Sequence, residues 1–213
     1  MSASNARQLE NDPPMVVAKI GDTYRAYLET QIQQGFAAAF DADIHDFYPL
    51  LSQLSNGRGE CVLGLRFAEE ATLFLESYLD KPIERYLPEF ASRSEIAELG
   101  NLYSTHRSAT IEHFIVISRA LLSQNIHFLA FTGTLQVRKL MQLLQVPVIE
   151  LGVADAKCVE SAKDYGTYYE ANPKTCIVDL RLANQTIESV ALYSKIAIHV
   201  EPHIEKLKAG LIA

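Results

Sequence analysis

The sequence lacks an excess of basic residues, since 19 Lys and Arg stand against 26 Asp and Glu and the formal net charge is −7. Non-specific nucleic-acid binding needs clustered Lys and Arg to neutralise phosphates, so this composition argues against nucleic acid as a partner. Cysteine is also scarce. The three cysteines are an odd number without metal-like spacing, which predicts free thiols in a reducing compartment.

Long apolar runs are missing as well. No stretch approaches the length of a membrane span, and the segment MSASNARQLENDPP has no apolar run behind Arg7. We therefore expect no integral membrane segment, no secretory signal and a cytoplasmic protein. With 48% hydrophobic and 21% charged residues, the 213-residue chain predicts one globular domain, preceded by a flexible tail over residues 1–18.

One stretch in the middle of the chain predicts a strand that leads into a helix. Residues 96–102 are apolar or β-capable apart from Glu98, and Gly100-Asn101 marks a point where a strand bulges or splays. A polar turn with His106 and Arg107 follows, and then apolar residues recur at helical spacing up to residue 124. Because a helix N-terminus presents free N–H groups, this turn is a candidate anion site.

The remaining patterns predict a mixed sheet with helices. Helices are expected over 23–40, 135–145, 154–165 and 187–211, with Pro202 as a break in the last, and strands over 61–67, 127–131, 147–151 and 175–182. The turn signal Asn56-Gly57-Arg58-Gly59 predicts a hairpin over 50–67, and a short strand over 72–75 is expected to feed a helix capped by Asp80. Strand and helix alternate from residue 96 onward, which implies an α/β sheet with parallel pairing in its centre.

Several separate sequence blocks carry a family resemblance over about residues 24–182. The runs GLRFAEEATLFLESYLDKPIER (64–85), EIAELGNLYS (95–104), FTGTLQVRKL (131–140) and KDYGTYYEANP (163–173) resemble the signature blocks of the thermostable hemolysin family. That family is similar in layout to GNAT-type N-acyltransferases and to acyl-homoserine-lactone synthases. The resemblance implies an α/β (α+β mixed sheet) GNAT-like acyltransferase domain over 19–184, splayed after Gly100-Asn101, with an added C-terminal helical segment over 185–213.

The resemblance also implies a donor site, with the pantetheine arm of an acyl thioester in the splay and its pyrophosphate on the following loop. The residues implied for this site are Leu102, Ser104, His106, Arg107, Ser108, Ala109, Thr110 and Thr132. The typical GNAT loop reads Arg/Gln-x-x-Gly-x-Gly/Ala, whereas no glycine stands between residues 104 and 110 here. Acyl-CoA and the acyl-phosphopantetheine of an acyl carrier protein both stay open as co-substrate, and no metal is expected.

Acyl transfer to an amine needs a base, donors for the tetrahedral oxyanion and an acid for the leaving thiolate. We interpret Glu98 as the base, although a strand acid paired with an arginine fits the same residue. The resemblance points to Tyr168 or Tyr169 as the acid, while packing of an aromatic ring at the core rim is the alternative.

Three further residues are candidates for binding the acceptor. Arg66 and Glu76 are expected at the ends of neighbouring strands, where they would either bind the acceptor with Glu98 or form a structural salt bridge. Asn101 would either orient the acceptor or occupy a left-handed backbone position.

The function expected from this layout is biosynthetic N-acyl transfer from an acyl thioester to an amine of a small amino-acid-like metabolite. The alternatives are a membrane-active hemolysin-type protein and a non-catalytic GNAT-shaped binding module. Direct lysis would want a basic amphipathic helix or a set of alternating barrel strands, and neither pattern is visible. The C-terminal segment would dock either on the domain or on a second copy of the chain, as a homodimer.

Overall fold

The computed structural model describes residues 14–88 and 91–212. Within them, seven strands form one sheet in the order β1-β2-β3-β4-β5-β7-β6. The strands are β1 (Met15–Lys19), β2 (Leu50–Ser55), β3 (Glu60–Phe67), β4 (Ile96–Ser104), β5 (Phe128–Gly133), β6 (Ile149–Val153) and β7 (Lys174–Asp179). All neighbours pair antiparallel except β4 and β5, which pair in parallel at the centre. The mixed sheet and its parallel centre were predicted and are confirmed.

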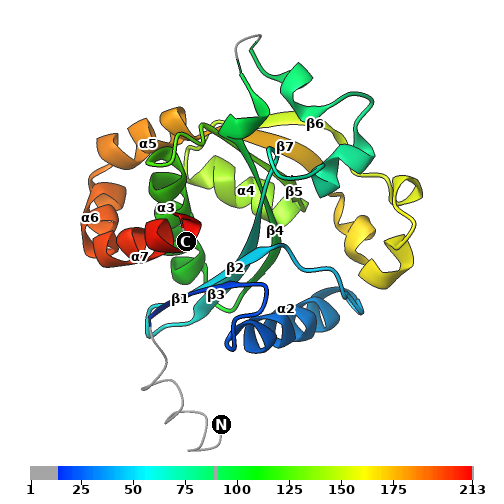
Figure 1. The fold of residues 1–213 in the computed structure, drawn as a ribbon, viewed down its shortest axis with the longest axis horizontal. Coiled ribbons are helices and arrows are strands. Elements are labelled where there is room, and N and C mark those ends of the chain that lie inside the picture. Colours follow the sequence, from blue (N-terminus) through cyan, green and yellow to red (C-terminus); the bar gives the residue numbers. More distant parts are fainter. Residues whose placement is uncertain (1–13, 89–90, 213) are drawn as a thin grey trace, which may run out of the picture.

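Helices cover the sheet on its two faces (Figure 1). They are α2 (Arg25–Phe40), α3 (Arg107–Leu122), α4 (Leu135–Leu143), α5 (Leu180–Ser189), α6 (Ala191–His199) and α7 (Glu201–Ile212). Helices α3, α5, α6 and α7 gather on one side, and α2 lies across the other side below β1, β2 and β3 (Figure 1). The C-terminal helices therefore pack on α3 and extend the same hydrophobic core.

Successive side chains of β2 and β3 point to opposite faces of the sheet, and this alternation decides which residues face α3 and which face α2. Leu50, Leu63 and Leu65 are fully or almost fully buried in the core that includes α3, while Leu51 and Val62 pack in a separate cluster with α2. Successive side chains of a strand point to opposite faces, so a run that is apolar on both faces fits a strand covered on both sides. Each buried leucine stabilises the fold by about 1.5–3 kcal/mol.

Segment 68–95, of which the structure describes residues 68–88 and 91–95, covers the α2 face of β4, β5 and β7, and these described residues form no strand. The predicted strand over 72–75 is wrong, because Leu73 is extended but unpaired and the chain then forms the 3₁₀ helices η1 (Phe74–Tyr78), η2 (Ile83–Tyr86) and η3 (Arg93–Glu95). Asp80 caps no helix: its carboxylate accepts a hydrogen bond from the Tyr86 hydroxyl. Pro82 is the N-cap of η2, and this helix ends after Tyr86 because Leu87, which precedes Pro88, is extended.

Other predicted boundaries shift for identifiable reasons. The strand expected over 175–182 ends as β7 at Asp179, whose side chain accepts a hydrogen bond from the Arg181 N–H and begins α5. The strand expected over 127–131 runs on as β5 to Gly133, before Thr134 caps α4. The helix expected over 154–165 is two 3₁₀ turns, η4 (Ala156–Cys158) and η5 (Ala162–Tyr165).

The predicted flexible tail falls mostly on residues 1–13, which lie outside the described residues. Residues 15–18 belong instead to β1, which pairs with β2 from Met15 opposite Leu54 to Lys19 opposite Leu50. The expected boundary between residues 184 and 185 lies inside α5, and the domain limits stay predictions. None of the helices described in the structure is long and apolar enough to cross a membrane.

Candidate functional site

The parallel pair at the centre of the sheet separates before its strands end. Residues 96–99 of β4 pair with residues 128–131 of β5, and no pair follows Leu99 and Phe131. Strand β5 continues to Gly133 beside β7, whereas β4 continues to Ser104 beside β3. The two strands therefore diverge, and the edge of β4 that faces β5 is unpaired from Gly100 onward. This is the splay that was predicted after Gly100-Asn101.

A bulge in β4 bends the strand away from β5. Gly100 lies opposite Gly64 and Tyr103 lies opposite Val62, so two β4 residues stand against one β3 residue between them. Asn101, one of the two, has a φ of 50°, in the left-handed region that Asn tolerates better than most residues. This backbone position was one of the two roles predicted for Asn101.

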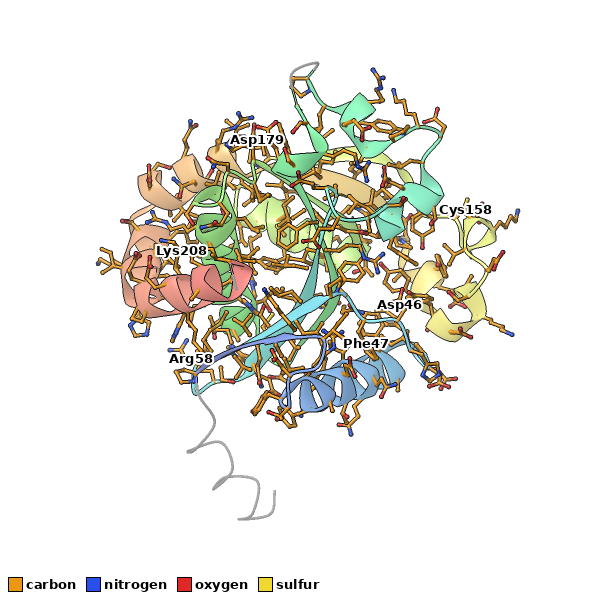
Figure 2. The ribbon with its side chains drawn as sticks, viewed as in Figure 1. Asp46, Phe47, Arg58, Cys158, Asp179 and Lys208 are labelled. Atoms are coloured by element: carbon orange, nitrogen blue, oxygen red, sulfur yellow. The ribbon has the colours of Figure 1, made fainter. Side chains whose placement is uncertain are left out.

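The Asn101 side chain ties the bulge to the segment that precedes β2. Its Oδ1 accepts a hydrogen bond from the Tyr48 N–H at 2.9 Å, and its Nδ2 donates to the Asp46 carbonyl at 3.1 Å. Figure 2 places Asp46 and Phe47 on the chain between α2 and the sheet, on the same side of the molecule as Cys158. The bulge thereby fixes both the splay and the position of residues 46–48.

A cavity of about 790 Å³ occupies the splay. Its walls come from α2, residues 46–48, η1, β4, the N-terminus of α3, the end of β5, α4 and residues 165–168. A separate apolar cavity of about 70 Å³ lies toward α3 and α5 and shares Leu99, Phe131 and Val137 with the large one. The large cavity falls within the range of small-molecule sites, and an apolar space adjoins it across three side chains.

Glu98 is buried beside this cavity, with 1% of its surface exposed. Its carboxylate accepts hydrogen bonds from the Phe74 N–H at 2.7 Å and the Leu75 N–H at 2.9 Å, and the Tyr48 hydroxyl lies near enough to lower the pKa of Glu98. Burial raises the pKa of Glu98 to about 7, against the lowering effect of these donors and of Arg66. A carboxyl group poised near neutral pH can accept or release a proton at working pH.

Tyr48 lines the cavity and stands next to Glu98. The Arg66 guanidinium lies 4.6 Å from the centre of the Tyr48 ring. The backbone carbonyl of Tyr48 accepts a hydrogen bond from Arg25 Nη2 at 2.9 Å. Burial raises the pKa of the Tyr48 hydroxyl, with the Glu98 charge as a further cause, so the phenol stays protonated and donates. Sequence reasoning missed this residue.

The structure separates Arg66 from Glu76, which the sequence placed together. Arg66 faces Glu98 as its cross-strand neighbour in the β3–β4 register and lies 3.9 Å from the Asp46 carboxylate. Glu76 is not on a strand: it lies in η1, pairs with Arg93 at 2.8 Å and accepts hydrogen bonds from the backbone of the same segment. Glu76 therefore braces segment 68–95, while Arg66 belongs to the buried group around Glu98.

The two candidate tyrosines occupy different positions. Tyr168 lines the cavity, and its hydroxyl donates to the Thr132 carbonyl at 3.1 Å. Tyr169 is not among the cavity walls, and its hydroxyl bonds to that of Tyr78 at 2.9 Å. Burial raises the pKa of both phenols, so both are proton donors at neutral pH. Of the two, Tyr168 is placed to meet a ligand.

The loop after β4 has its own side-chain cap. His106 is the N-cap of α3, where its Nδ1 accepts a hydrogen bond from the Ser108 N–H at 3.2 Å and contacts the Ser108 hydroxyl at 2.8 Å. Asn56 Nδ2 also donates to that hydroxyl, at 3.0 Å. One backbone N–H that a phosphate would use is therefore already bonded to His106. The glycine-free loop thus forms a helix N-terminus capped by a side chain, and not a concave group of free N–H donors. Arg107 lines the cavity and is exposed.

The other residues implied for the donor site differ in whether they line the cavity. Leu102, Ser104 and Thr110 line the cavity, with the Thr110 hydroxyl donating to Ser104 Oγ at 2.8 Å. Ala109 is fully buried and does not line it. The Thr132 hydroxyl oxygen is buried in the cavity wall and has no hydrogen-bond partner within the described part of the chain. Such an orphan hydroxyl fits a ligand group better than a packing role.

Metal ligands do not gather anywhere in residues 14–88 and 91–212, because no group of three His, Cys, Asp or Glu side chains there is placed to hold an ion. Cys61 and Cys176 are buried free thiols, and Cys158 is an exposed one. The polar groups that meet at the cavity include carboxyl, phenol, hydroxyl, amide, imidazole, guanidinium and ammonium groups.

Comparisons with known proteins agree with the resemblance found in the sequence. The family model described as thermostable hemolysin matches residues 18–184. No curated protein matches the sequence.

Solved structures show where the fold recurs. FeeM, an N-acyl amino acid synthase from uncultured soil microbes, aligns with a TM-score of 0.54 at 16% identity over 86% of this chain and 98% of its own. The CoA-dependent acyl-homoserine lactone synthase BjaI, with SAM and isopentyl-CoA, gives 0.53 at 13% identity over 87% and 90%. The AHL synthase LasI gives 0.51 at 14% identity over 78% and 90%. The predicted acyltransferase fold is thereby confirmed.

Proposed function

The chain belongs to the thermostable hemolysin family, and from its fold and its splayed site we propose that it is an N-acyltransferase. It moves an acyl group from an acyl thioester to an amine of a small amino-acid-like metabolite. The observation that carries the proposal is the buried Glu98 carboxyl group, poised near neutrality beside a cavity that opens between the two parallel strands.

The splay supplies a place for the arm of the thioester. From Gly100 onward the inner edge of β4 has N–H and C=O groups without a strand partner, and a pantetheine arm carries amides that pair with such an edge. On the opposite wall the Thr132 hydroxyl is buried without a partner, and rotation about its Cα–Cβ bond would bring it to an amide or carbonyl of the arm. The acyl chain then points to the adjoining apolar cavity behind Leu99, Phe131 and Val137.

The donor is an acyl-CoA or an acyl carrier protein, and the helix start favours the carrier protein. A pyrophosphate seeks several free N–H groups at a helix N-terminus, whereas His106 already caps one of them here. Arg107 and Lys139, which lie on the cavity wall, are able to meet the single phosphate of a carrier-bound arm. The CoA dependence of BjaI, a neighbour in fold, keeps acyl-CoA as the other donor.

The chemistry follows from the groups around the cavity. The acceptor nitrogen attacks the thioester carbonyl carbon, and its proton is taken up by Glu98. Backbone N–H groups of the β4 bulge near Leu102 stabilise the oxyanion of the tetrahedral intermediate. When the C–S bond breaks, Tyr168 donates its hydroxyl proton to the leaving thiolate. The products are an amide and a free thiol.

The acceptor binds beside Tyr48, where the charged and amide groups outside the donor arm gather. Asn101 and Asp46 line this part of the cavity, and Arg66 lies behind them against the Tyr48 ring. Opposite charges of this kind suit a small molecule that carries both an amine and a carboxylate. The likeness in fold to FeeM, an N-acyl amino acid synthase, supports the same class of acceptor.

Direct detection of both products tests the proposal. The full chain is incubated with acyl-CoA and acyl-carrier-protein thioesters of several chain lengths and with a panel of amino acids. Thiol release is followed with a disulfide reagent, and the amide is identified by mass spectrometry. We expect thiol and amide in equal amounts for at least one pair. Binding of no donor, and no thiol above the no-enzyme rate, would contradict the proposal.

A further inference from the structure

Glu98 has no direct access to the cavity. Its side chain does not line the walls, and the donors around it are the Phe74 and Leu75 N–H groups and the Tyr48 hydroxyl. Of these three donors, only the Tyr48 hydroxyl belongs to a residue whose side chain stands between Glu98 and the cavity and carries an exchangeable proton. An amine in the cavity therefore meets Tyr48 before it meets Glu98.

We infer that Tyr48 contacts the acceptor amine and relays its proton to Glu98. This inference rests on the proposed function and names a residue that acts in it. A water molecule in place of Tyr48 would do the same chemistry, but contacts from several elements hold this phenol in place.

The chain holds Tyr48 at both its backbone and its ring. Asn101 Oδ1 accepts the Tyr48 N–H at 2.9 Å, and Arg25 Nη2 donates to the Tyr48 carbonyl at 2.9 Å. Arg66 covers the ring. A residue held at its N–H, its carbonyl and its ring keeps its hydroxyl at one place, as a relay requires.

Two glycines leave the space that the Tyr48 ring occupies. A Cβ atom on Gly100 would lie 2.5 Å from Tyr48 Cζ and 2.8 Å from its hydroxyl oxygen, and one on Gly64 would lie 2.8 Å from Tyr48 Cβ. These glycines face each other in the β3–β4 register, in strand interiors where glycine is unfavourable by about 0.5–1 kcal/mol. Their presence is explained by the ring lying across both strands at the bulge.

The relay balances as two linked proton transfers. As the N–C bond forms, one amine proton moves to the Tyr48 oxygen, while the proton of the Tyr48 hydroxyl moves to a carboxylate oxygen of Glu98. Collapse of the intermediate breaks the C–S bond, and Tyr168 protonates the thiolate. Glu98 then releases its proton to solvent through Tyr48, and Tyr168 regains one, so the protein is unchanged after each turnover.

The charged and titratable groups around the pair set its pH dependence. Arg66 lies over the Tyr48 ring, and Tyr165 lies near both Tyr48 and Glu98 from the opposite wall. Arg66 lowers the pKa of Tyr48, which makes the phenol a better relay than burial alone would leave it. Burial, followed by the charge of Asp46, raises the pKa of Tyr165 and keeps it neutral.

Tyr48→Phe tests the relay because it keeps the ring and removes only the hydroxyl. We expect kcat to fall about 100-fold or more, with the KM for the thioester unchanged, since a positioned proton carrier contributes about 10²–10⁴ in rate. The double variant with Glu98→Gln should lose no more than the more impaired single variant, because both residues act in one step. Tyr86→Phe is the control, because Tyr86 does not line the cavity and its hydroxyl bonds to Asp80, and it should stay within about threefold of the wild type.

A second measurement avoids any loss of packing. Fluorotyrosine at position 48 keeps the ring and lowers the phenol pKa, so the rate should vary with the number of fluorine atoms if the phenol carries the proton. Full activity of Tyr48→Phe, or a rate insensitive to fluorine, would overturn the relay and leave the proposed function standing. Absence of transfer by the wild type with every donor and acceptor would overturn the proposed function and the relay together.

Discussion

Two buried titratable side chains lie on opposite faces of the sheet, and they differ in access to open space. Glu98 faces segment 68–95 and stands one side chain away from the large cavity. His113 of α3 is fully buried, and its two ring nitrogens bond to the Ser52 hydroxyl at 2.9 Å and the Cys61 carbonyl at 3.0 Å. Burial lowers the pKa of His113 to about 3.

The comparison teaches that a shifted pKa does not identify a site by itself. Both groups are perturbed mainly by burial, yet only Glu98 has a neighbour that reaches a cavity. His113 lines neither of the two cavities, and both of its ring nitrogens have hydrogen-bond partners. Its role is therefore structural: it satisfies buried polar groups of β2 and β3 that lie under α3. Function should therefore respond to Glu98, and stability to His113.

The largest expected effect is on turnover. Glu98→Gln should lower the rate of acyl transfer by about 10²–10⁴-fold, because the amide cannot take up a proton. Its thermal midpoint should fall by only a few degrees, since the amide oxygen still accepts one of the two backbone N–H groups. Amide formation by mass spectrometry and a thermal melt measure the two effects. A rate within threefold of the wild type would remove Glu98 from the mechanism.

His113→Leu should show the opposite pattern. The variant leaves the Ser52 hydroxyl and the Cys61 carbonyl without their partner, and each unsatisfied buried group costs about 1–3 kcal/mol. The free energy of unfolding, measured with urea, should fall by that order. Activity per folded molecule should not change at a temperature well below the melt. Loss of activity without loss of stability would break the comparison.

The two groups should also give opposite pH dependence of stability. The pKa of His113 is lower in the folded than in the unfolded state, so its contribution is lost as pH falls below about 6.5. The pKa of Glu98 is raised from 4.5 to about 7, so its contribution is present below 4.5 and is lost as pH rises to about 7. Between pH 4.5 and 6.5 these slopes, each about 1.4 kcal/mol per pH unit, oppose one another.

Single variants should expose each slope. In Glu98→Gln the stability relative to the wild type should decrease from pH 6.5 to pH 4.5, and in His113→Leu it should increase, by about 3 kcal/mol over the interval in each case. Urea unfolding at several pH values measures both differences, and groups that titrate alike in all chains cancel. Parallel curves for the wild type and both variants would contradict the assigned pKa shifts.

The smallest effect is expected at the donor arm. Thr132→Val removes the unpartnered hydroxyl and keeps the shape of the side chain. The KM for pantetheine thioesters should rise by about 3–10-fold, the worth of one hydrogen bond, while the chain becomes no less stable. A short thioester without the pantetheine amides serves as the control, and its KM should not change. An unchanged KM for both donors would place the arm elsewhere.

Sequence reasoning reached the centre of the site because its signals are local. Glu98, the strand around it and the flaw at Gly100-Asn101 lie within a few residues, so the splay could be predicted from the sequence alone. The helix after the loop could also be predicted from its spacing, and the structure shows that its N-cap is His106.

Tyr48 escaped the same reasoning because its partners are remote in sequence. Glu98 and Gly100 follow it by about 50 residues, and a tyrosine before a proline belongs to no periodic pattern. Glu76 was misplaced for a different reason: a short apolar run reads the same as a strand or as a 3₁₀ segment covering a sheet. In both cases tertiary packing, not local preference, decided the outcome.

The pH dependence of kcat/KM for amide formation tests the central claim most directly. For the wild type we expect kcat/KM to rise about a hundredfold per pH unit below about pH 7, where Glu98 and the acceptor amine both lose a proton, and about tenfold per unit above it, where only the amine still titrates. In Glu98→Gln the steeper rise below about pH 7 should disappear, leaving only the titration of the acceptor amine. The same steeper rise in the variant and in the wild type would show that another group takes the proton, and would contradict the role assigned to Glu98.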